Sequence, residues 1–300
     1  MPVTSGATGN WSRWGDDDQA GALNLVTPQV TRRAAGLVHD GRTLSLAQPL
    51  GPSSPSPGHR PRPARFMNRD AGDYALGART PGGFKFAEDT VQFPTHTGTH
   101  VDALSHAWAG EHLYNGHPEA STRSTRGAQR CGAEHLAPVV TRGVMADLVA
   151  AAGGPLPRQA PVERADLERG IAEAGVTPEP GDAVLIRTGW WEAHGADGAA
   201  GNYFDGEPGI TGDAAAWLAE RDVALVGADN YAVEQQTDEP GFPAHLVLLH
   251  RHGVPLIENL DLAGLACALG DSGRSTFLLL FAPLPLVGST GSPVTPVAVL

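Results

Sequence analysis

Glycine and proline divide this 300-residue chain into short segments, because it contains 38 glycines and 25 prolines. Proline is excluded from helix interiors and central strands, and both residues are concentrated in turns. Six prolines fall between residues 49 and 63, which predicts an extended loop there. A bundle of long helices is therefore excluded, and the pattern favours short strands that alternate with short helices.

Apolar segments bounded by these turns predict a mixed α/β fold. Thr27 and Pro28 are typical of an N-cap and a first helical position, so a helix is expected over 28–38 and a strand over 43–47. The segment 84–93 alternates apolar and polar residues around Glu88 and Asp89, which predicts a hairpin. No segment has the composition of a linker, so residues 1–300 are predicted to form a single domain. Further helices are expected over 161–175, 213–221 and 244–251, and further strands over 183–187, 223–227, 254–260, 277–282 and 294–299.

The charge balance and the cysteine content exclude several classes of protein. Acidic residues outnumber basic ones, which gives a formal net charge of −12, and the basic residues do not cluster. We therefore expect no binding to nucleic acid or to an anionic membrane. Cys131 and Cys267 are the only cysteines and lie far apart in the sequence. This leaves neither a disulfide framework nor a thiolate zinc site, and it favours the reducing cytoplasm.

Neither a signal peptide nor a membrane span is predicted. The N-terminal region contains an acidic triplet, Asp16 to Asp18, and lacks the cationic and apolar regions of a signal peptide. The most apolar stretch, 277–287, is interrupted by Pro283 and Pro285. It is also shorter than the roughly 20 residues that a helix needs to cross a bilayer. A soluble, cytoplasmic protein is therefore expected.

The segment from His96 to His106 concentrates three histidines and one aspartate within eleven residues. Imidazole and carboxylate are common ligands of divalent metal ions. In a straight strand His96 and His100 would lie about 13 Å apart, and in a helix Asp102 would point about 160° away from His100. We therefore expect the segment to bend at Gly98, where a positive φ costs least.

Taken singly, each of these residues is better explained as part of a solvent-exposed polar turn. Their grouping around one bend of small residues favours a metal site instead. In this interpretation His96, His100 and Asp102 bind the ion and leave positions open for water and substrate, as in catalytic metal sites. His106, the remaining histidine, is predicted to transfer protons.

A second group of candidate ligands occurs later in the chain. Glu258 follows the apolar run 254–257, where a carboxylate is costly unless it is paired, hydrogen-bonded or bound to a metal. His245 lies on the predicted helix before this run, so packing could bring both residues towards the first segment. His250 and His252, near the end of that helix, are better explained as surface residues.

Aromatic and acidic residues near these segments are candidates for substrate contacts. Trp190 and Trp191 could form a wall for a planar substrate, although packing in the core or at an interface explains them equally well. Trp108 and Asp229 complete the predicted substrate-binding residues. The chain contains no GxGxxG, GxxxxGK[ST] or GxSxG motif, so nucleotide binding and a serine hydrolase with a nucleophile elbow have no support.

The segment HTGTHVDALSH resembles the HxGTHxDxPxH signature of the metal-dependent cyclase family, which includes bacterial kynurenine formamidase and isatin hydrolase. Only the proline differs, and Leu104 takes its place. The resemblance extends over most of the chain, through the segments WSRWGDDDQAGALNLVTP (11–28), YNG (114–116), LIRTGW (185–190), GADNYAVE (227–234) and HLVLLHRHGVPLIENL (245–260).

The resemblance implies a role for each motif residue. It implies that His96, His100 and Asp102 bind the metal and that His106 is the catalytic proton donor or acceptor. His245 and Glu258 match the pair that completes a second zinc site in the two-zinc formamidases, and they lie one residue farther apart here. One divalent ion is therefore expected, with these residues available for a second. The implied fold is a swivelling β/β/α domain with a small barrel-like sheet, assembled as a homodimer or homotetramer.

These observations predict a divalent-metal-dependent hydrolase, with Zn²⁺ or Mn²⁺, that cleaves a C–N bond of a small amide, formamide or lactam. The ion would activate water, and His106 would move the proton. Three alternatives remain open: a biosynthetic cyclase or dehydratase that enolises a carbonyl substrate, a lactone hydrolase, and a metal-loaded binding protein without turnover. The presence of His106 beside a complete set of metal ligands argues against a binding protein, because binding alone needs no proton transfer.

Overall fold

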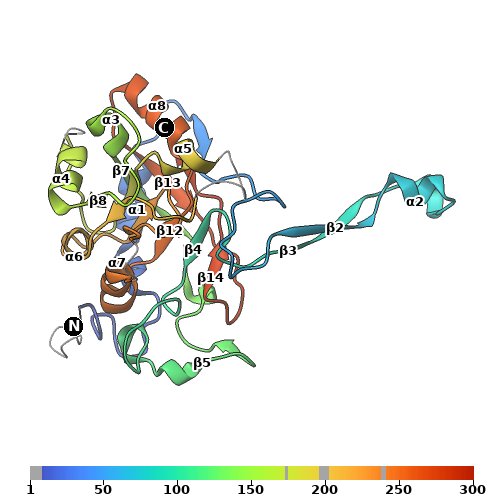
Figure 1. Ribbon diagram of the computed structural model, residues 1–300, viewed down its shortest axis with the longest axis horizontal. Helices are drawn as coiled ribbons and strands as arrows, with labels where there is room; N and C mark the ends of the chain where they lie inside the picture. Colours follow the sequence, from blue (N-terminus) through green and yellow to red (C-terminus); the bar gives the residue numbers. More distant parts are fainter. Residues whose placement is uncertain (1–8, 173–174, 196–202, 238–240) are drawn as a thin grey trace.

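The computed structural model describes residues 9–172, 175–195, 203–237 and 241–300, and its central element is one large curled sheet (Figure 1). Nine strands form this sheet in the order β1-β15-β13-β7-β9-β11-β12-β4-β14. The mixed α/β prediction is confirmed. Their bounds are β1 (Thr43–Ser45), β15 (Val297–Val299), β13 (Thr276–Phe281), β7 (Val139–Asp147), β9 (Ala183–Arg187), β11 (Leu225–Ala228), β12 (Leu256–Glu258), β4 (His100–Asp102) and β14 (Gly291–Pro293).

The sheet combines a parallel centre with antiparallel edges. Strands β7, β9, β11 and β12 run parallel to one another, whereas β4 pairs antiparallel with both β12 and β14. Parallel neighbours require crossover connections, and helical segments supply them here. Three two-stranded sheets lie outside the large one: β8 (Pro161–Val162) with β10 (Gly209–Ile210), β5 (Thr122–Arg123) with β6 (Gly127–Ala128), and β2 (Ala64–Arg69) with β3 (Glu88–Gln92).

The helices are short, as the distribution of glycine and proline predicts. Thr27 caps the first one by accepting a hydrogen bond from the amide of Val30, and Pro28 is its first residue. The α-helices are α1 (Pro28–Ala35), α2 (Ala71–Ala75), α3 (Leu148–Ala152), α4 (Arg164–Ala172), α5 (Trp190–His194), α6 (Gly212–Ala219), α7 (Pro243–His245) and α8 (Ala263–Ser272). The 3-10 turns are Gly21–Leu25, Pro81–Gly83, Tyr114–Gly116, Glu119–Ser121 and Ala133–His135, and a π-helix covers Leu246–His252.

Two sequence predictions for local structure need correction. The helix predicted over 161–175 begins only at Arg164, because Pro161 and Val162 pair with β10; positions 173–174 at its predicted end lie outside the described residues. The hairpin predicted within 84–93 is instead the pairing of β3 with β2. Glu88 and Asp89 lie inside β3 and do not form the turn.

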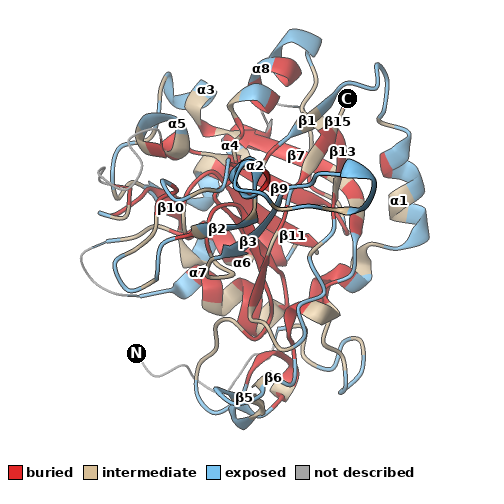
Figure 2. Cartoon of the chain, turned by 90° about the vertical axis from the view of Figure 1, so that its right-hand side faces the viewer, coloured by how far each residue is buried: buried red, intermediate tan, exposed pale blue. Residues whose placement is uncertain are grey.

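Hydrophobic residues fill both faces of the sheet (Figure 2). Along β9, Val184 and Ile186 belong to one buried cluster, and Ala183 and Leu185 belong to the other. A strand buried on both faces has a continuous apolar sequence. This explains why the segment 183–187 is apolar throughout its first four residues.

A long arm made by β2, α2 and β3 extends away from the rest of the molecule (Figure 1). Most of its large apolar side chains are exposed, above all Leu76 at 92% and Phe84 at 66%, whereas Tyr74 is buried. The arm begins directly after the proline-rich segment that the sequence predicts to be extended. Among the described residues, none of the helices combines the length and the hydropathy needed to span a bilayer.

Candidate metal centre and cavity

The first ligand segment bends where the sequence predicts. Gly98 has a φ of +62°, a conformation that glycine adopts without strain. The bend brings the rings of His96 and His100 to a centroid separation of 5.0 Å. His96 lies in the turn, and His100 opens strand β4, which ends at Asp102.

Strand pairing brings two carboxylates next to these histidines. Glu258 ends β12 and is the antiparallel partner of His100 on β4. The His100 Nε2 atom lies 3.2 Å from Glu258 Oε2 and 3.5 Å from Asp102 Oδ1, and His96 Nδ1 lies 2.8 Å from the same Asp102 oxygen. Gly291 on β14 pairs with Asp102, and a Cβ atom at Gly291 would lie 2.6 Å from the His96 ring. Glycine is therefore required there to leave room for the imidazole.

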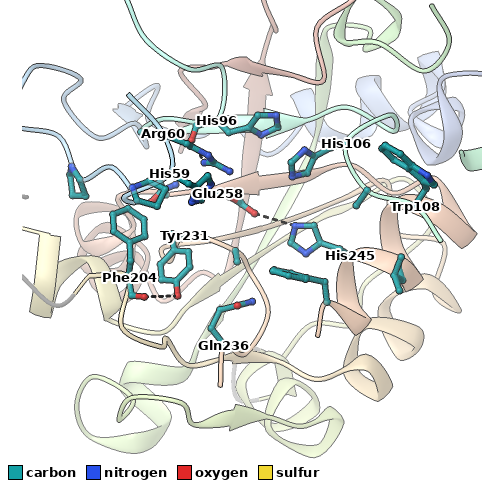
Figure 3. A pocket seen from close by; sticks show the side chains of 18 residues that line it. His59, Arg60, His96, His106, Trp108, Phe204, Tyr231, Gln236, His245 and Glu258 are labelled. Atoms are coloured by element: carbon teal, nitrogen blue, oxygen red, sulfur yellow. Dashed lines mark hydrogen bonds and ion pairs between the residues drawn. The ribbon is translucent and has the colours of Figure 1, made fainter. Parts of the chain in front are cut away.

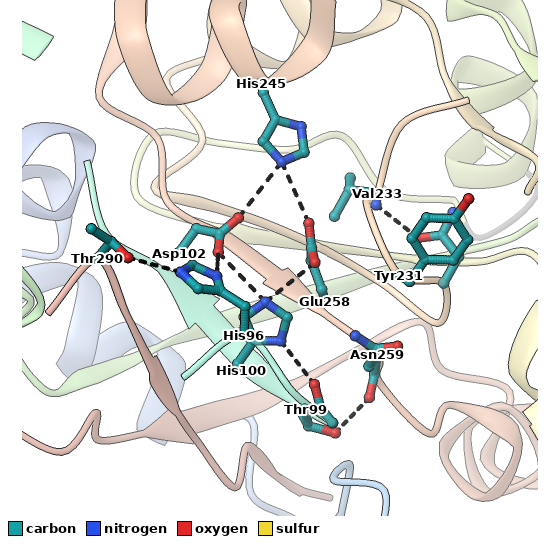
Figure 4. Close-up of polar contacts among 12 residues, drawn as sticks. His96, Thr99, His100, Asp102, Tyr231, Val233, His245, Glu258, Asn259 and Thr290 are labelled. Carbon is teal, nitrogen blue, oxygen red and sulfur yellow. Dashed lines mark hydrogen bonds and ion pairs between the residues drawn. The ribbon is translucent and has the colours of Figure 1, made fainter. Parts of the chain in front are cut away.

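His245 approaches the same carboxylates from the opposite side (Figure 4). Its Nε2 atom lies 3.4 Å from Glu258 Oε1 and 3.7 Å from Asp102 Oδ2. The π-helix Leu246–His252 follows directly, and a π-helical turn contains more residues than an α-helical one. The chain then leads into β12, where Glu258 meets His245.

Each of these three histidines is held by one ring nitrogen and presents the other to the carboxylates. His96 Nε2 contacts Thr290 Oγ1 at 3.0 Å, and His100 Nδ1 contacts the carbonyl oxygen of Gly98 at 2.8 Å. His245 Nδ1 forms a hydrogen bond with the buried Glu234. This is how metal-binding histidines are oriented by their surroundings in proteins.

The atoms that face the centre of this cluster lack hydrogen-bond partners although they are buried. They are His96 Nδ1, His100 Nε2 and both carboxylate oxygens of Asp102. Buried polar atoms are almost always paired, so such a group needs an explanation such as an ion. His100, Asp102 and Glu258 form one possible ligand group, and His96, Asp102 and His106 form another, with all ligand atoms of each group within 4.8 Å. The donor set is therefore suited to a divalent ion.

The electrostatics of the cluster favour charged carboxylates. Burial acts to raise the pKa of Asp102, but the histidines around it, His106, His245 and His96, hold that pKa well below its ordinary value. Burial and Asp102 likewise act to raise the pKa of Glu258, and the facing imidazoles of His100 and His245 outweigh them and lower it. Both carboxylates are thus available to bind a cation at neutral pH.

His106 lies at the edge of this cluster and lines a cavity. Its ring stacks on that of His96 at a centroid distance of 4.0 Å. Burial lowers the pKa of His106 to about 4, so the imidazole is neutral at pH 7 and can accept a proton. It also belongs to one of the two possible ligand groups, so its position is compatible with either role.

The cavity above the cluster has a volume of about 740 Å³ (Figure 3). Small-molecule sites commonly have this size. Its wall includes the predicted residues His96, His106, Trp108, His245 and Glu258. The lining residues that the sequence argument missed are Pro55, Pro57, His59, Arg60, Gly98, Ala107, Phe204, Tyr231, Ala232, Gln236, Phe242, Leu246 and Asn259.

Three of the predicted substrate-binding residues lie elsewhere. Trp190 is fully buried, and its indole N–H donates to the Tyr203 carbonyl oxygen. The buried carboxylate of Asp229 accepts hydrogen bonds from Thr188 and Gly189. Neither these two residues nor Trp191 lines the cavity, so packing explains them, and Phe204, Tyr231 and Phe242 supply the aromatic wall instead.

The prediction that His250 is a surface residue is also wrong. His250 is buried and packs edge-on against Trp11, with ring centroids 5.4 Å apart. Trp11 donates its indole N–H to the carbonyl oxygen of His250. His252 is partly exposed.

Known proteins share the fold of this chain. A family model described as "Putative cyclase" matches residues 44–235. The chain belongs to this cyclase family. A crystal structure described as a novel cyclase shares 38% sequence identity with it and superposes with a TM-score of 0.92, covering 98% of this chain and 100% of that one.

More distant members of the fold include proteins whose descriptions state an activity. Isatin hydrolase A from Labrenzia aggregata is 23% identical, with a TM-score of 0.61 and coverage of 90% of this chain and 96% of that one. A predicted metal-dependent hydrolase from Bacillus stearothermophilus is 21% identical, with a TM-score of 0.54 and coverage of 87% and 98%. At 21–23% sequence identity, the structural similarity shows that this chain shares the fold of these proteins. Among curated protein sequences, none matches it.

Proposed function

We propose that this protein is a divalent-metal-dependent hydrolase that cleaves a C–N bond of a small amide, formamide or lactam. The observation that carries the proposal is a buried cluster of imidazole and carboxylate groups, of which His96, His245 and Glu258 also line a substrate-sized cavity. The shared fold with isatin hydrolase A gives additional support.

In His96 and His100, one ring nitrogen is occupied by a contact with the protein, so the other nitrogen is the one that can bind an ion. His96 Nδ1 and His100 Nε2, which both lie near Asp102 Oδ1, would hold one ion together with Asp102, and His245 Nε2 with Glu258 could share in a second. Nitrogen and oxygen ligands suit Zn²⁺ or Mn²⁺. A bound ion supplies Lewis-acid polarisation of a carbonyl group and a lowered pKa for water.

His106 would move the proton in this reaction. Its low pKa keeps the ring neutral, so it can accept a proton from water and return it to the leaving nitrogen. Phe204, Tyr231 and Phe242 line the same cavity as His106 and would contact the apolar part of the substrate.

Hydrolysis in ¹⁸O-labelled water separates this function from its rivals. Purified enzyme is incubated with formanilides, isatin-like lactams and lactones, and products are analysed by mass spectrometry. An amide or lactam hydrolase places one labelled oxygen in the carboxylate product. A cyclase or dehydratase would yield unlabelled product, a binding protein would return the substrate unchanged, and labelling of lactones alone would assign the protein as a lactone hydrolase.

Thr290 is not a proposed metal ligand, but its substitution tests whether His96 binds the ion. Because its hydroxyl contacts His96 Nε2, Thr290→Val should weaken metal affinity by about 10–100-fold, as is typical for partners of metal-binding histidines. Thr290→Ser, which keeps the hydroxyl, should stay close to wild type. Equal affinities for the two variants, measured by competition with a chelator, would contradict the assignment of His96 Nδ1 as a ligand.

We also propose that the chain assembles as a homodimer or homotetramer through the arm 64–92. An isolated two-stranded hairpin is marginally stable in water, and this arm exposes Phe66, Met67, Leu76, Phe84 and Val91. The arm holds four basic and four acidic residues, whereas the whole chain has an acidic excess. A second copy can therefore accept it without strong charge repulsion.

The arm proposal predicts a change of mass in solution. Wild-type protein should be a dimer or tetramer by light scattering, and Leu76→Asp combined with Phe84→Asp should yield monomers. The melting temperature of the body should change little, because neither side chain is buried within the chain. Wild-type protein that is monomeric at tens of micromolar would refute this proposal.

The two free cysteines support placement of the protein in the cytoplasm. Cys131 is buried and Cys267 is exposed, and neither forms a disulfide. Exposed free thiols persist in reducing compartments.

A further inference from the structure

Arg60 is a cation in the cavity wall that no motif in the sequence identifies. It lies on the proline-rich loop, and it is the only arginine or lysine among the described residues that line the cavity. Its Nη1 atom donates a hydrogen bond of 2.5 Å to the carbonyl oxygen of His96. The guanidinium is thereby fixed beside the metal-ligand segment, as Figure 3 shows.

The remaining donors of Arg60 have no acidic partner among the described residues. Within residues 9–172, 175–195, 203–237 and 241–300, no carboxylate forms an ion pair with it, and its side chain is partly buried. Two other partly buried arginines, Arg142 and Arg187, are paired with Asp182 and Asp147. Among the described residues, Arg69, Arg221, Arg251 and Arg274 are likewise partly buried and form no ion pair, but none of them lines the cavity. A guanidinium has five N–H donors arranged to bind a carboxylate through two hydrogen bonds.

The surroundings of Arg60 indicate what kind of molecule would supply that carboxylate. Phe204 and Tyr231 line the same cavity with ring centroids 4.9 Å apart, and they provide an apolar surface suited to a ring. The metal-ligand cluster is reached through His96, whose carbonyl oxygen anchors Arg60. A flat molecule could therefore contact the aromatic wall, the cluster and Arg60 together.

We propose that Arg60 binds a carboxylate on the substrate, so that the preferred substrates are aryl amides that bear an acidic group. This inference rests on the proposed hydrolase function and adds a substrate class to it. Arg60 acts as a specificity-determining residue: its hydrogen bonds to a carboxylate favour binding of the acidic substrate and contribute nothing to a neutral one.

Matched substrates test this proposal. 3-Formamidobenzoate and formanilide differ by one carboxylate, and wild-type enzyme should prefer the acidic compound in kcat/KM by about 10–100-fold, the value expected for charge-assisted hydrogen bonds. Arg60→Gln should remove most of this preference and leave formanilide hydrolysis within about threefold of wild type. Arg60→Lys should keep part of it. Arg62→Gln is the matched control, because Arg62 is exposed and does not line the cavity.

An equal loss of activity towards both substrates in Arg60→Gln would overturn the proposal, because it would place Arg60 at the scissile carbonyl or at the support of His96. Metal content is measured on the same preparations. Loss of metal in Arg60→Gln would likewise overturn the proposal, because it would show that Arg60 positions His96 and does not bind the substrate.

Equilibrium binding keeps the inference testable if neither formamide is hydrolysed. Benzoate and benzamide are titrated by calorimetry into wild type, Arg60→Gln, Arg60→Lys and Arg62→Gln. Benzoate should bind at least about tenfold more tightly than benzamide, and only Arg60→Gln should lose that difference. Unchanged benzoate affinity in Arg60→Gln would refute a role for Arg60 in anion recognition. The absence of turnover in every protein would count against the proposed hydrolase function alone.

Discussion

Asp102→Asn is expected to abolish both metal binding and turnover. Asp102 is shared by the two possible ligand groups, and both of its oxygens are buried without a hydrogen-bond partner. The asparagine keeps the shape of the side chain but loses its charge and one acceptor oxygen. Affinity should therefore fall by more than the roughly 10–100-fold that loss of a partner of a ligand costs. Metal content and turnover are measured together.

Asp229→Asn is the matched control for this variant. Asp229 is an equally buried aspartate that directly follows β11, but its oxygens accept hydrogen bonds from Thr188 and Gly189. The control should lower the melting temperature and leave metal content unchanged. If Asp102→Asn keeps its metal and its rate while losing only stability, the carboxylate has a purely structural role.

His106→Asn is expected to keep the metal and lose about 10²–10⁴-fold in turnover, the usual contribution of a general acid or base. The reason is its position: it lines the cavity and stacks on His96, and its lowered pKa keeps it neutral at pH 7. Rate, metal content and melting temperature are measured on one preparation.

His250→Asn is a suitable control for loss of a buried imidazole, because His250 packs on Trp11 away from the cavity. It should reduce stability and leave the rate per folded molecule near that of wild type. Loss of metal in His106→Asn would make His106 a ligand, as its group with His96 and Asp102 allows. A nearly normal rate would remove it from the mechanism.

Local chemistry made part of this structure predictable. The N-cap at Thr27, the strand 183–187 and the bend at Gly98 each depend on a few neighbouring residues, and all three occur. The metal-ligand segment could be recognised for the same reason, since its ligands lie within one short stretch of chain.

The rest of the site depends on packing between distant segments, which composition and spacing do not encode. Glu258 meets His100 through the register of two antiparallel strands, and Arg60 reaches the cavity through the path of a proline-rich loop. The same limitation applies to Trp190. It follows a strand, as a cavity residue could, but it is fully buried and packs against Tyr203 and His194.

Metal analysis coupled to chelation tests the central claim most directly. Purified protein is analysed for metals by mass spectrometry, then exhaustively chelated, assayed against amides and lactams, and reconstituted with Zn²⁺ or Mn²⁺. We predict at least one tightly bound divalent ion per chain, loss of turnover on chelation and recovery on reconstitution. Protein that is free of metal and fully active after chelation would contradict the account.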